Sequence, residues 1–357
     1  MAIQYLSGNR LQGTSTERTA LNLSTPPQTG WKEVGRETLS SAATSITCSF
    51  TPKDNMTFLF FRPSQSSITG NGTMRLGYNS VDSGSNYSDR SSSYGNSDGT
   101  NTGQSGFNEW DTGSLERFDV LNMPNIASKE KLVIGHGNIL SANGAGTAPY
   151  RREYVAKWAN TSNQANRFYV APSTSGTGYA AGTEIVALGC DDDEADSGSN
   201  FWQELADVSV SSGSTIDTGT ITAKKYLYFQ VYTVPSGTSY SWLQFNSDTG
   251  SNYASRYSTN NGGESTSTSS NDGILYYAPF NSSVRYMDGY IVNKSGNEKL
   301  VIGEGNAQNT AGAGNGTERR ELYGKWANTS DSITSIQVKS KNGSFATGTR
   351  LRVWGAN

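Results

Sequence analysis

The sequence predicts an all-β protein made of two tandem jelly-roll-like β-sandwiches that arose from an internal duplication, preceded by an extended N-terminal arm. Three observations support this fold class. The 357 residues include 40 glycines and are only 34 % hydrophobic and 17 % charged, yet 11 % are aromatic. Disordered chains of such low apolar content are normally poor in aromatics, so the composition favours β-structure with polar connections. Alternating strand-like segments and a long internal repeat are the second and third observations.

The repeat is clearest between residues 130–162 and 298–330, which match without a gap at 20 of 33 positions. A DSGSNY motif at 82–87 also matches a DTGSNY motif at 248–253. Each copy is long enough to bury its own core. The chain therefore divides into an N-terminal arm at 1–29, a first sandwich at 30–190, an acidic Gly/Ser linker at 191–200 and a second sandwich at 201–357.

Strands are expected where aromatic and β-branched residues alternate with polar ones, as at 55–61, 73–78, 225–234 and 241–245. Further strands are expected to begin near Arg151 and Arg319 and to end at the following tryptophans. No segment has the pattern of an amphipathic helix. Large aromatics repeated on strands favour buried anchors, here Trp31, Trp202, Trp158 and Trp326.

Two kinds of segment are expected to connect the strands. The long polar stretches 80–117 and 247–273 predict loops at one end of each sandwich. Glycine pairs predict tight turns, because glycine adopts positive φ without steric cost. These pairs are Gly135 and Gly137, Gly144 and Gly146, and their copies Gly303 and Gly305, Gly312 and Gly314.

Charge and cysteine content limit the function classes. With 28 basic and 31 acidic residues, the net charge of −3 argues against a nucleic-acid binder, because no basic stripe can neutralise phosphates. Cys48 and Cys190 are too few for a disulfide scaffold and are expected to be buried free thiols. The opening residues lack the features of a secretory signal and no apolar run could span a membrane, so we expect a soluble chain made in the cytoplasm.

The residues present predict no catalytic site, and we expect no enzyme. A Ser–His or Cys–His system would need the single histidine, His136, which is expected to be a turn residue and is replaced by Glu304 in the second copy. Glycoside hydrolysis needs two carboxylates, and Glu153 and Glu321 stand out. Because alternate strand residues share a face, these glutamates are better interpreted as ion pairs with Arg151 and Arg319.

No cofactor is expected. The acidic run in the linker is interpreted as a solvated spacer, with Ca²⁺ binding as the alternative that its carboxylates leave open. The run does not follow EF-hand spacing. The candidate Ca²⁺ ligands are Asp191, Asp192, Asp193 and Glu194.

Binding is more plausible than catalysis. Aromatic and arginine side chains lie among small polar residues in the two long predicted loops, where aromatic faces could stack on sugar rings. The alternative is that the tyrosines pack against the sandwich edges and the arginines cap loop carbonyls. The candidate contact residues are Tyr87, Arg90, Tyr94, Tyr253, Arg256 and Tyr257.

Several motifs resemble those of putative virion structural proteins of marine-type tailed bacteriophages. They are QYLSGNRLQG at 4–13, WKEVGR at 31–36, DTGSNY at 248–253, EKLVIG at 298–303 and GKWANTS at 324–330. The resemblance implies a non-enzymatic β-sandwich protein on the virion surface, serving as a capsid decoration, head-fibre or tail-fibre component. It brings no catalytic or metal-binding residues.

The partners expected from this resemblance are other virion proteins of the capsid or tail. The N-terminal arm is expected to anchor the protein, by adding a strand to an open sheet edge, through Tyr5, Leu6, Arg10 and Leu11. A homo-oligomer is expected, and a trimer is one form of it. The alternative functions are a tail protein that binds host-surface glycans through the predicted loops, and a subunit of a surface filament. Neither nucleic acid nor membrane insertion is expected.

Overall fold

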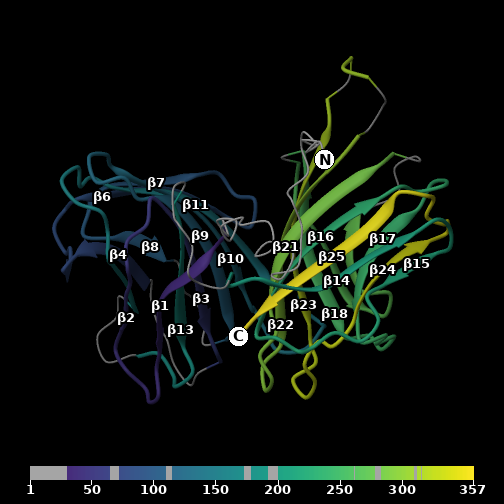
Figure 1. The fold of residues 1–357 in the computed structure, drawn as a ribbon, viewed down its shortest axis with the longest axis horizontal. Coiled ribbons are helices and arrows are strands. Elements are labelled where there is room, and N and C mark those ends of the chain that lie inside the picture. Colours follow the sequence, from purple (N-terminus) through teal and green to yellow (C-terminus); the bar gives the residue numbers. More distant parts are fainter. Residues whose placement is uncertain are drawn as a thin grey trace, which may run out of the picture.

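The computed structural model describes residues 30–64, 72–109, 115–172, 178–191, 200–260, 262–277, 283–308, 312–314 and 316–357. Every regular secondary-structure element in these ranges is a β-strand, which confirms the predicted all-β class. Figure 1 shows two β-sandwiches, one built from residues 32–190 and the other from residues 203–356. Among the described residues there is no helix with the length and apolar character that a membrane crossing requires.

The first sandwich packs an eight-stranded antiparallel sheet, ordered β1-β13-β3-β9-β10-β11-β6-β7, on a five-stranded sheet, ordered β2-β12-β4-β5 with β8 beside β4. Its strands are β1 (Lys32–Thr38), β2 (Ile46–Ser49), β3 (Asn55–Arg62), β4 (Gly72–Tyr78), β5 (Ser80–Val81), β6 (Tyr87–Ser93), β7 (Gly99–Gln104), β8 (Phe107–Glu109), β9 (Arg117–Pro124), β10 (Lys131–Ile139), β11 (Tyr150–Trp158), β12 (Arg167–Pro172) and β13 (Glu184–Cys190).

The second sandwich repeats this arrangement, with sheets ordered β14-β25-β16-β21-β22-β23-β18-β19 and β15-β24-β17-β20. Its strands are β14 (Gln203–Val210), β15 (Thr215–Asp217), β16 (Tyr226–Thr233), β17 (Tyr240–Phe245), β18 (Tyr253–Thr259), β19 (Ser265–Ser270), β20 (Ile274–Tyr277), β21 (Arg285–Val292), β22 (Lys299–Ala307), β23 (Glu318–Trp326), β24 (Ile336–Lys341) and β25 (Thr349–Ala356). The large sheets correspond strand for strand, as expected of two copies of one unit.

Each sandwich has its own apolar core between its two sheets. Trp158 and Trp326 are 1 % exposed, which confirms them as core anchors. Trp31 and Trp202 are only half-buried and pack instead on the apolar residues between the sandwiches. Cys48 is a buried free thiol, and burial raises its pKa to about 12. Cys190 forms no disulfide, donates to the Asp191 carbonyl (3.8 Å) and is only half-buried, so its expected burial is wrong.

The predicted loops at 80–117 and 247–273 are wrong in large part. Strands β6, β7 and β8 lie in the first segment, and β18 and β19 lie in the second. Strands β7 and β19 are polar because they are the outermost strands of the two large sheets and are mostly exposed. Serine and threonine keep such an edge soluble, so apolar alternation is absent from these strands.

The turn prediction fails at one glycine pair of the first sandwich and succeeds at another. Gly135 and Gly137 lie inside β10, where they leave room for neighbouring side chains. A Cβ at Gly135 would lie 2.2 Å from the Tyr154 ring, and one at Gly137 would lie 2.5 Å from an Asp119 carboxylate oxygen. Gly144 does occupy a turn, with φ of 78°, and its copy Gly312 has φ of 85°.

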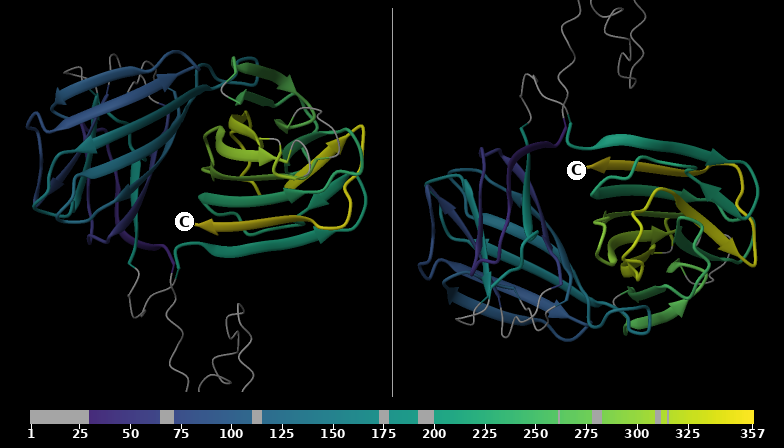
Figure 2. Two further views of the ribbon diagram at one scale, coloured as in Figure 1. Left: turned by 90° about the horizontal axis from the view of Figure 1, so that it is seen from above. Right: turned by 90° about the horizontal axis from the view of Figure 1, so that it is seen from below.

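The sandwiches meet through the outer faces of their large sheets, and the C terminus lies between them (Figure 2). Apolar side chains from both sandwiches form a third buried cluster at this contact. Its members are Leu59, Phe61, Phe118, Val120, Leu140, Val186 and Leu188 from the first sandwich, and Phe201, Tyr226, Val292, Leu300, Ile302, Tyr323 and Ala356 from the second. An apolar contact of this kind favours a fixed arrangement of the two sandwiches.

The loop between β10 and β11 adds polar contacts to this interface. The Lys325 ammonium donates to the Ala142 carbonyl (2.6 Å), and the Ser269 amide donates to the Ala145 carbonyl (2.7 Å). Elsewhere in the interface, the Asn138 side chain donates to the Val301 and Gly324 carbonyls (2.8 and 2.9 Å). Each of these bonds is accepted by a backbone carbonyl, so together they help to fix the register between the sandwiches.

Candidate functional site

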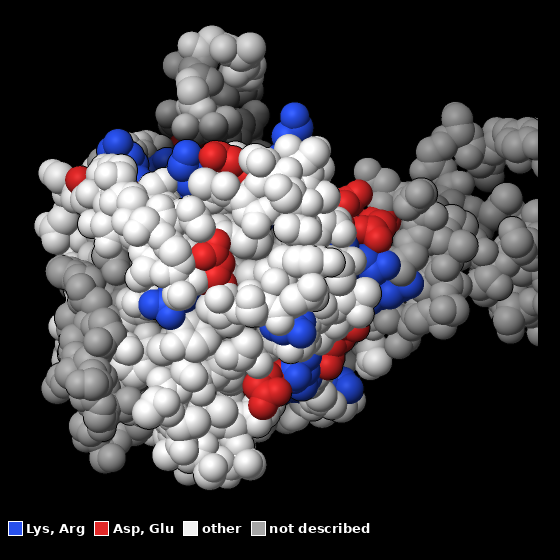
Figure 3. All heavy atoms as spheres, turned by 90° about the vertical axis from the view of Figure 1, so that its left-hand side faces the viewer, with Lys and Arg blue, Asp and Glu red and all other residues white. Residues whose placement is uncertain are grey.

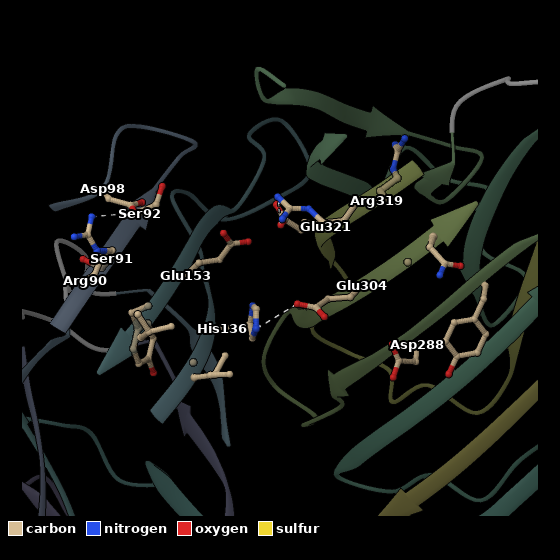
Figure 4. A pocket seen from close by; sticks show the side chains of 18 residues that line it. Arg90, Ser91, Ser92, Asp98, His136, Glu153, Asp288, Glu304, Arg319 and Glu321 are labelled. Carbon is tan, nitrogen blue, oxygen red and sulfur yellow. Dashed lines mark ion pairs between the residues drawn. The ribbon is translucent and has the colours of Figure 1, made fainter. Parts of the chain in front are cut away.

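A hollow with a volume of about 620 Å³ lies between the sandwiches (Figure 4). Strands β6, β10 and β11 form one wall, and β21, β22 and β23 form the other. The lining residues are Arg90, Ser91, Ser92, Asp98, Ile134, Gly135, His136, Glu153, Tyr154 and Val155 from the first sandwich, and Tyr286, Asp288, Glu304, Gly305, Asn306, Arg319, Arg320 and Glu321 from the second. We call this hollow the interdomain cleft.

The wall from the first sandwich combines aliphatic and polar side chains. Ile134 and Val155 are paired across β10 and β11 and are 54 % and 47 % exposed. Leu132, two residues before Ile134 on the same face, is also exposed. Arg90 on β6 is exposed and pairs with Asp98 at 3.6 Å. This wall therefore offers an apolar patch with a cation beside it.

The wall from the second sandwich is polar and aromatic. Asp288, Glu304 and Glu321 are cross-strand neighbours on β21, β22 and β23, and the row that they form continues beside the cleft to Gln230 on β16. The next row is Tyr232, Tyr286, Asn306 and Arg319 on the same strands. Tyr232 is exposed and Tyr286 is half-buried. Carboxylate, amide and guanidinium groups thus alternate with tyrosine rings along this wall.

His136 joins the two walls at the base of the cleft. Its Nε2 lies 3.2 Å from a Glu304 carboxylate oxygen, and its Nδ1 lies 3.2 Å from the Tyr323 hydroxyl. The expected turn position of His136 is wrong, because the residue lies in the middle of β10. Figure 4 shows its ring between the two sheets, pointing toward Glu304.

Arg151 forms ion pairs with carboxylates from both sandwiches. Its guanidinium lies 3.4 Å from Glu153, 2.5 Å from Glu321 and 3.2 Å from Glu264. The predicted Arg151–Glu153 and Arg319–Glu321 ion pairs are confirmed, the latter at 2.8 Å. Burial and repulsion from Glu321 raise the pKa of Glu153 to about 7, although Arg151 opposes the shift.

Asp288 lies deeper in the same wall. Burial raises the pKa of this carboxyl, while a hydrogen bond from the Tyr228 hydroxyl (2.8 Å) opposes the shift. Tyr228 stacks near Tyr290 and Trp354, with ring centroids 4.9 and 5.6 Å apart. The aromatic surface therefore continues from the cleft across β16 toward β25.

Two of the six predicted contact residues are buried in the cores, which corrects their assignment. Tyr87 and Tyr253 are 1 % and 0 % exposed. The Tyr253 hydroxyl accepts from the Phe245 amide (3.1 Å), and the Tyr87 hydroxyl accepts from the Leu76 amide (3.0 Å). Both tyrosines therefore hold strands together and cannot reach a ligand. This is the edge-packing alternative that the sequence left open.

The other four predicted residues have different environments. Arg90 lines the cleft. Tyr94 and Arg256 meet across the interface, with the guanidinium 5.6 Å from the ring centroid, and Arg256 also donates to the Pro149 carbonyl (2.8 Å). Tyr257 is covered by the Arg320 guanidinium at 3.9 Å. Only Arg90 of the six is therefore placed to contact a ligand in the cleft.

The predicted Ca²⁺ ligands and anchor residues fall mostly outside the described residues. Asp191 is described, and its carboxylate pairs with Lys53 at 3.1 Å and accepts from the Asp54 amide at 2.7 Å. Asp192, Asp193 and Glu194, and the anchor residues Tyr5, Leu6, Arg10 and Leu11, lie outside them. Within the described part of the chain, no group of three or more His, Cys, Asp or Glu side chains could hold a metal ion.

The outward face of the first sandwich carries few charged side chains, in small groups of both signs (Figure 3). On the part of this face that the structure describes, Lys and Arg form no continuous stripe.

Comparison with known proteins finds little similarity. No family model matches the chain, and no match was found among curated proteins. Among solved structures, the chain is similar to domains LG4-5 of the mouse laminin alpha1 chain, with 9 % sequence identity over 92 % of both chains and a TM-score of 0.20.

Proposed function

We propose that this protein is a non-enzymatic, surface-exposed adhesion protein that binds glycans in the interdomain cleft. The observation that supports this most strongly is the composition of the cleft. The Tyr286 ring, the Ile134 and Val155 patch and planar polar groups converge in one hollow of about 620 Å³. Binding sites for small ligands commonly combine apolar walls with a few fixed polar groups, and sugars present both hydroxyls and apolar ring faces.

A glycan array tests this function directly. We expect the purified chain to bind a subset of glycans, and Tyr286→Ala to weaken that binding about tenfold, because it removes an aromatic face from the cleft. Tyr78→Ala is the matched control, since Tyr78 is 46 % exposed and does not line the cleft. Absence of any bound glycan, or equal loss in both variants, would overturn the proposal.

Binding is preferred to hydrolysis because of what lies between the candidate carboxylates. Glu153 and Glu321 both contact the Arg151 guanidinium, so a cation occupies the space that a glycosidic bond would need. We therefore expect no new reducing ends when the protein is incubated with the glycans that it binds. Release of reducing sugar that is lost in Glu153→Gln would contradict this expectation.

We propose the surface of a tailed-phage virion as the setting, and the motif resemblance described above is its support. Immunogold labelling of native particles tests this setting independently of glycan binding. Label on the head would favour a decoration protein, and label at the tail or fibres would favour host attachment. Particles without label would overturn the virion setting and leave the binding function to be judged by the array.

A further inference from the structure

The cleft and the buried interface are formed by equivalent surfaces of the two sandwiches, with the sandwiches interchanged. In the interface, β22 of the second sandwich packs on the first, and in the cleft its equivalent in the first sandwich, β10, faces the second. In the interface, Leu300 and Ile302 of the second sandwich are buried with residues of β3 and β9 of the first. Their copies in the first sandwich, 168 positions earlier, are Leu132 and Ile134, which are both 54 % exposed. The strands equivalent to β3 and β9 in the second sandwich are β16 and β21. Ile134 therefore faces, across the cleft, the kind of surface that covers its copy.

The surface opposite Ile134 cannot be covered in the same way, because its side chains differ. Phe118 and Val120 of the buried interface correspond, at the same offset, to Tyr286 and Asp288. Leu59 corresponds by strand register to Gln230. Docking an aliphatic side chain on these polar groups would desolvate them without compensation. The second sandwich thus keeps a polar, aromatic surface open where the first has an apolar contact.

We infer that the cleft takes a linear, uncharged oligosaccharide lying across the strands of the second sandwich; this rests on the proposed glycan-binding function. The row that would bind its hydroxyls continues beyond Gln230 to Arg352 on β25. Adjacent strands are about 4.8 Å apart, so the row from β25 to β23 is about 19 Å long. That length accommodates several linked sugar rings.

Aromatic residues flank this polar row on both sides. Tyr232 and Tyr286 lie two residues along the strands on one side of it, and Tyr228, Tyr290 and Trp354 lie two residues along on the other side, where Trp202 packs against Tyr228 and Tyr290. Sugar rings in the row would therefore have the Tyr232 and Tyr286 rings on one side and the Ile134 and Val155 patch opposite. A chain that runs along the row meets this combination at successive rings, which a single sugar does not.

The charges lining the cleft select against acidic glycans. The carboxylates are Asp98, Glu153, Asp288, Glu304 and Glu321, and the guanidinium groups are Arg90, Arg319 and Arg320. Arg90 and Arg319 already pair with carboxylates of this set. Asp288 and Glu304 lie at the centre of the row, and a Glu304 carboxylate oxygen lies 3.2 Å from the His136 ring. A uronate or sialic acid placed in the row would face these carboxylates at close range.

The test uses the intact chain and an array of linear oligosaccharides of one to six residues, in neutral, amino-sugar and uronate series. We expect affinity for the neutral series to rise at least tenfold from one to four residues and then to level off. We expect uronate oligomers of equal length to bind at least tenfold more weakly. In the double variant D288N/E304Q, the affinities for neutral and uronate oligomers of equal length should differ by no more than about threefold, because the two central charges are removed.

Glu130→Gln is the matched control, since Glu130 lies outside the cleft, its side chain is 40 % exposed, and it pairs with Lys157 at 3.2 Å. It should leave the preference unchanged. Uronate binding as tight as neutral binding, no dependence on length, or an unchanged preference in the double variant would each overturn this inference while the glycan-binding function stands. Failure of all three series to bind would overturn both.

Discussion

Asp248 accepts hydrogen bonds from three different parts of the second sandwich. The donors are the Trp326 indole (2.6 Å), the Asn252 side chain (2.9 Å) and the Gly250 amide (2.7 Å). Asp82 has the same set of partners in the first sandwich. Burial opposes ionisation of Asp248, but these three donors outweigh it and lower the pKa of the carboxyl. The repeated DxGSNY motif is therefore a structural corner that ties a core tryptophan to a strand start.

Replacing Asp248 by asparagine should destabilise the fold by about 1.5–3 kcal/mol at pH 7, because hydrogen bonds to a charged acceptor are lost. The stabilisation by Asp248 is present above the unfolded-state pKa of about 3.9 and is lost as pH falls through the lower folded-state pKa. Urea unfolding of the wild type and Asp248→Asn at pH 7 and pH 3 measures both effects. Asp98→Asn, at an exposed site, should change stability by less than about 0.5 kcal/mol, and an equal loss in both variants would contradict the corner role.

The repeated motif could be found in the sequence, but its role could not. Aromatic and polar residues among glycines are typical both of a ligand-binding loop and of a buried corner. What distinguishes a buried corner from a binding loop is the backbone group that the tyrosine hydroxyl contacts. That group lies 8 residues away for Tyr253 and 11 residues away for Tyr87. The pairing of each tryptophan with its aspartate spans 76 or 78 residues and has no local signal.

Strands β11 and β23 place two carboxylates, Glu153 and Glu321, close together across the interface. Glu153 on β11 and Glu321 on β23 share Arg151, and the raised pKa of Glu153, about 7, follows from burial and this proximity. The folded protein therefore retains a proton on Glu153 that the unfolded chain has released between about pH 4.3 and 7. Its contribution makes stability fall as pH rises through this window and then level off.

Glu153→Gln should remove that pH dependence. Relative to wild type, the variant should be more stable at pH 8 than at pH 5 by about 1–3 kcal/mol, at 1.4 kcal/mol for each unit of pKa shift. Thermal or urea unfolding at the two pH values measures the difference. The control Glu37→Gln changes an exposed position on β1, and its stability should depend on pH as that of the wild type does. If Glu153→Gln also kept the pH dependence of the wild type, the Glu153 carboxyl would ionise normally.

The strands with apolar alternation were predictable from sequence, and the polar edge strands were not. Strand β16 follows the predicted pattern, with Leu227, Phe229 and Val231 in the core. Strand β19, with the sequence STSTSS, pairs only with β18 along the sheet order and has no apolar face to reveal it. Gly135 and Gly137 were assigned to turns because glycine is usually needed there, whereas here their missing Cβ atoms admit Tyr154 and Asp119.

For the whole molecule, the apolar interface should make the two sandwiches unfold together. Leu300 is 0 % exposed in this interface and projects from the outer face of β22. We expect one calorimetric transition for the wild type. Leu300→Asp should split it into two, because a buried unpaired charge separates the sandwiches without entering either core.

Leu132→Asp is the matched control for that experiment, since Leu132 is the repeat equivalent of Leu300 and is 54 % exposed. It should leave a single transition with nearly unchanged midpoint. Two transitions in the wild type would contradict the rigid arrangement. A single transition in Leu300→Asp, at a strongly lowered temperature, would place Leu300 in a core rather than at an interface.

The repetition of the sandwich was predictable from the 168-residue offset, but the cleft was not. Its walls belong to different copies, and the copies diverge where they meet: His136 is opposed to Glu304, its own repeat equivalent. Arg90 was identified as a contact residue, whereas Tyr286, Asp288 and Asn306 were not. They lie on a strand face, and only the packing of the other sandwich turns that face into one side of a cleft.

A glycan held between both sandwiches should bind more weakly when either wall is changed, and titration calorimetry of two single variants measures this. Arg90→Ala changes the first wall and Tyr286→Ala changes the second, and Tyr78→Ala serves as control. With the neutral tetrasaccharide that the array binds most tightly, we predict that both cleft variants lose at least about fivefold in affinity, or roughly 1 kcal/mol, while the control is unchanged. Wild-type affinity in both cleft variants, or a loss confined to one wall, would contradict a site shared by the two sandwiches.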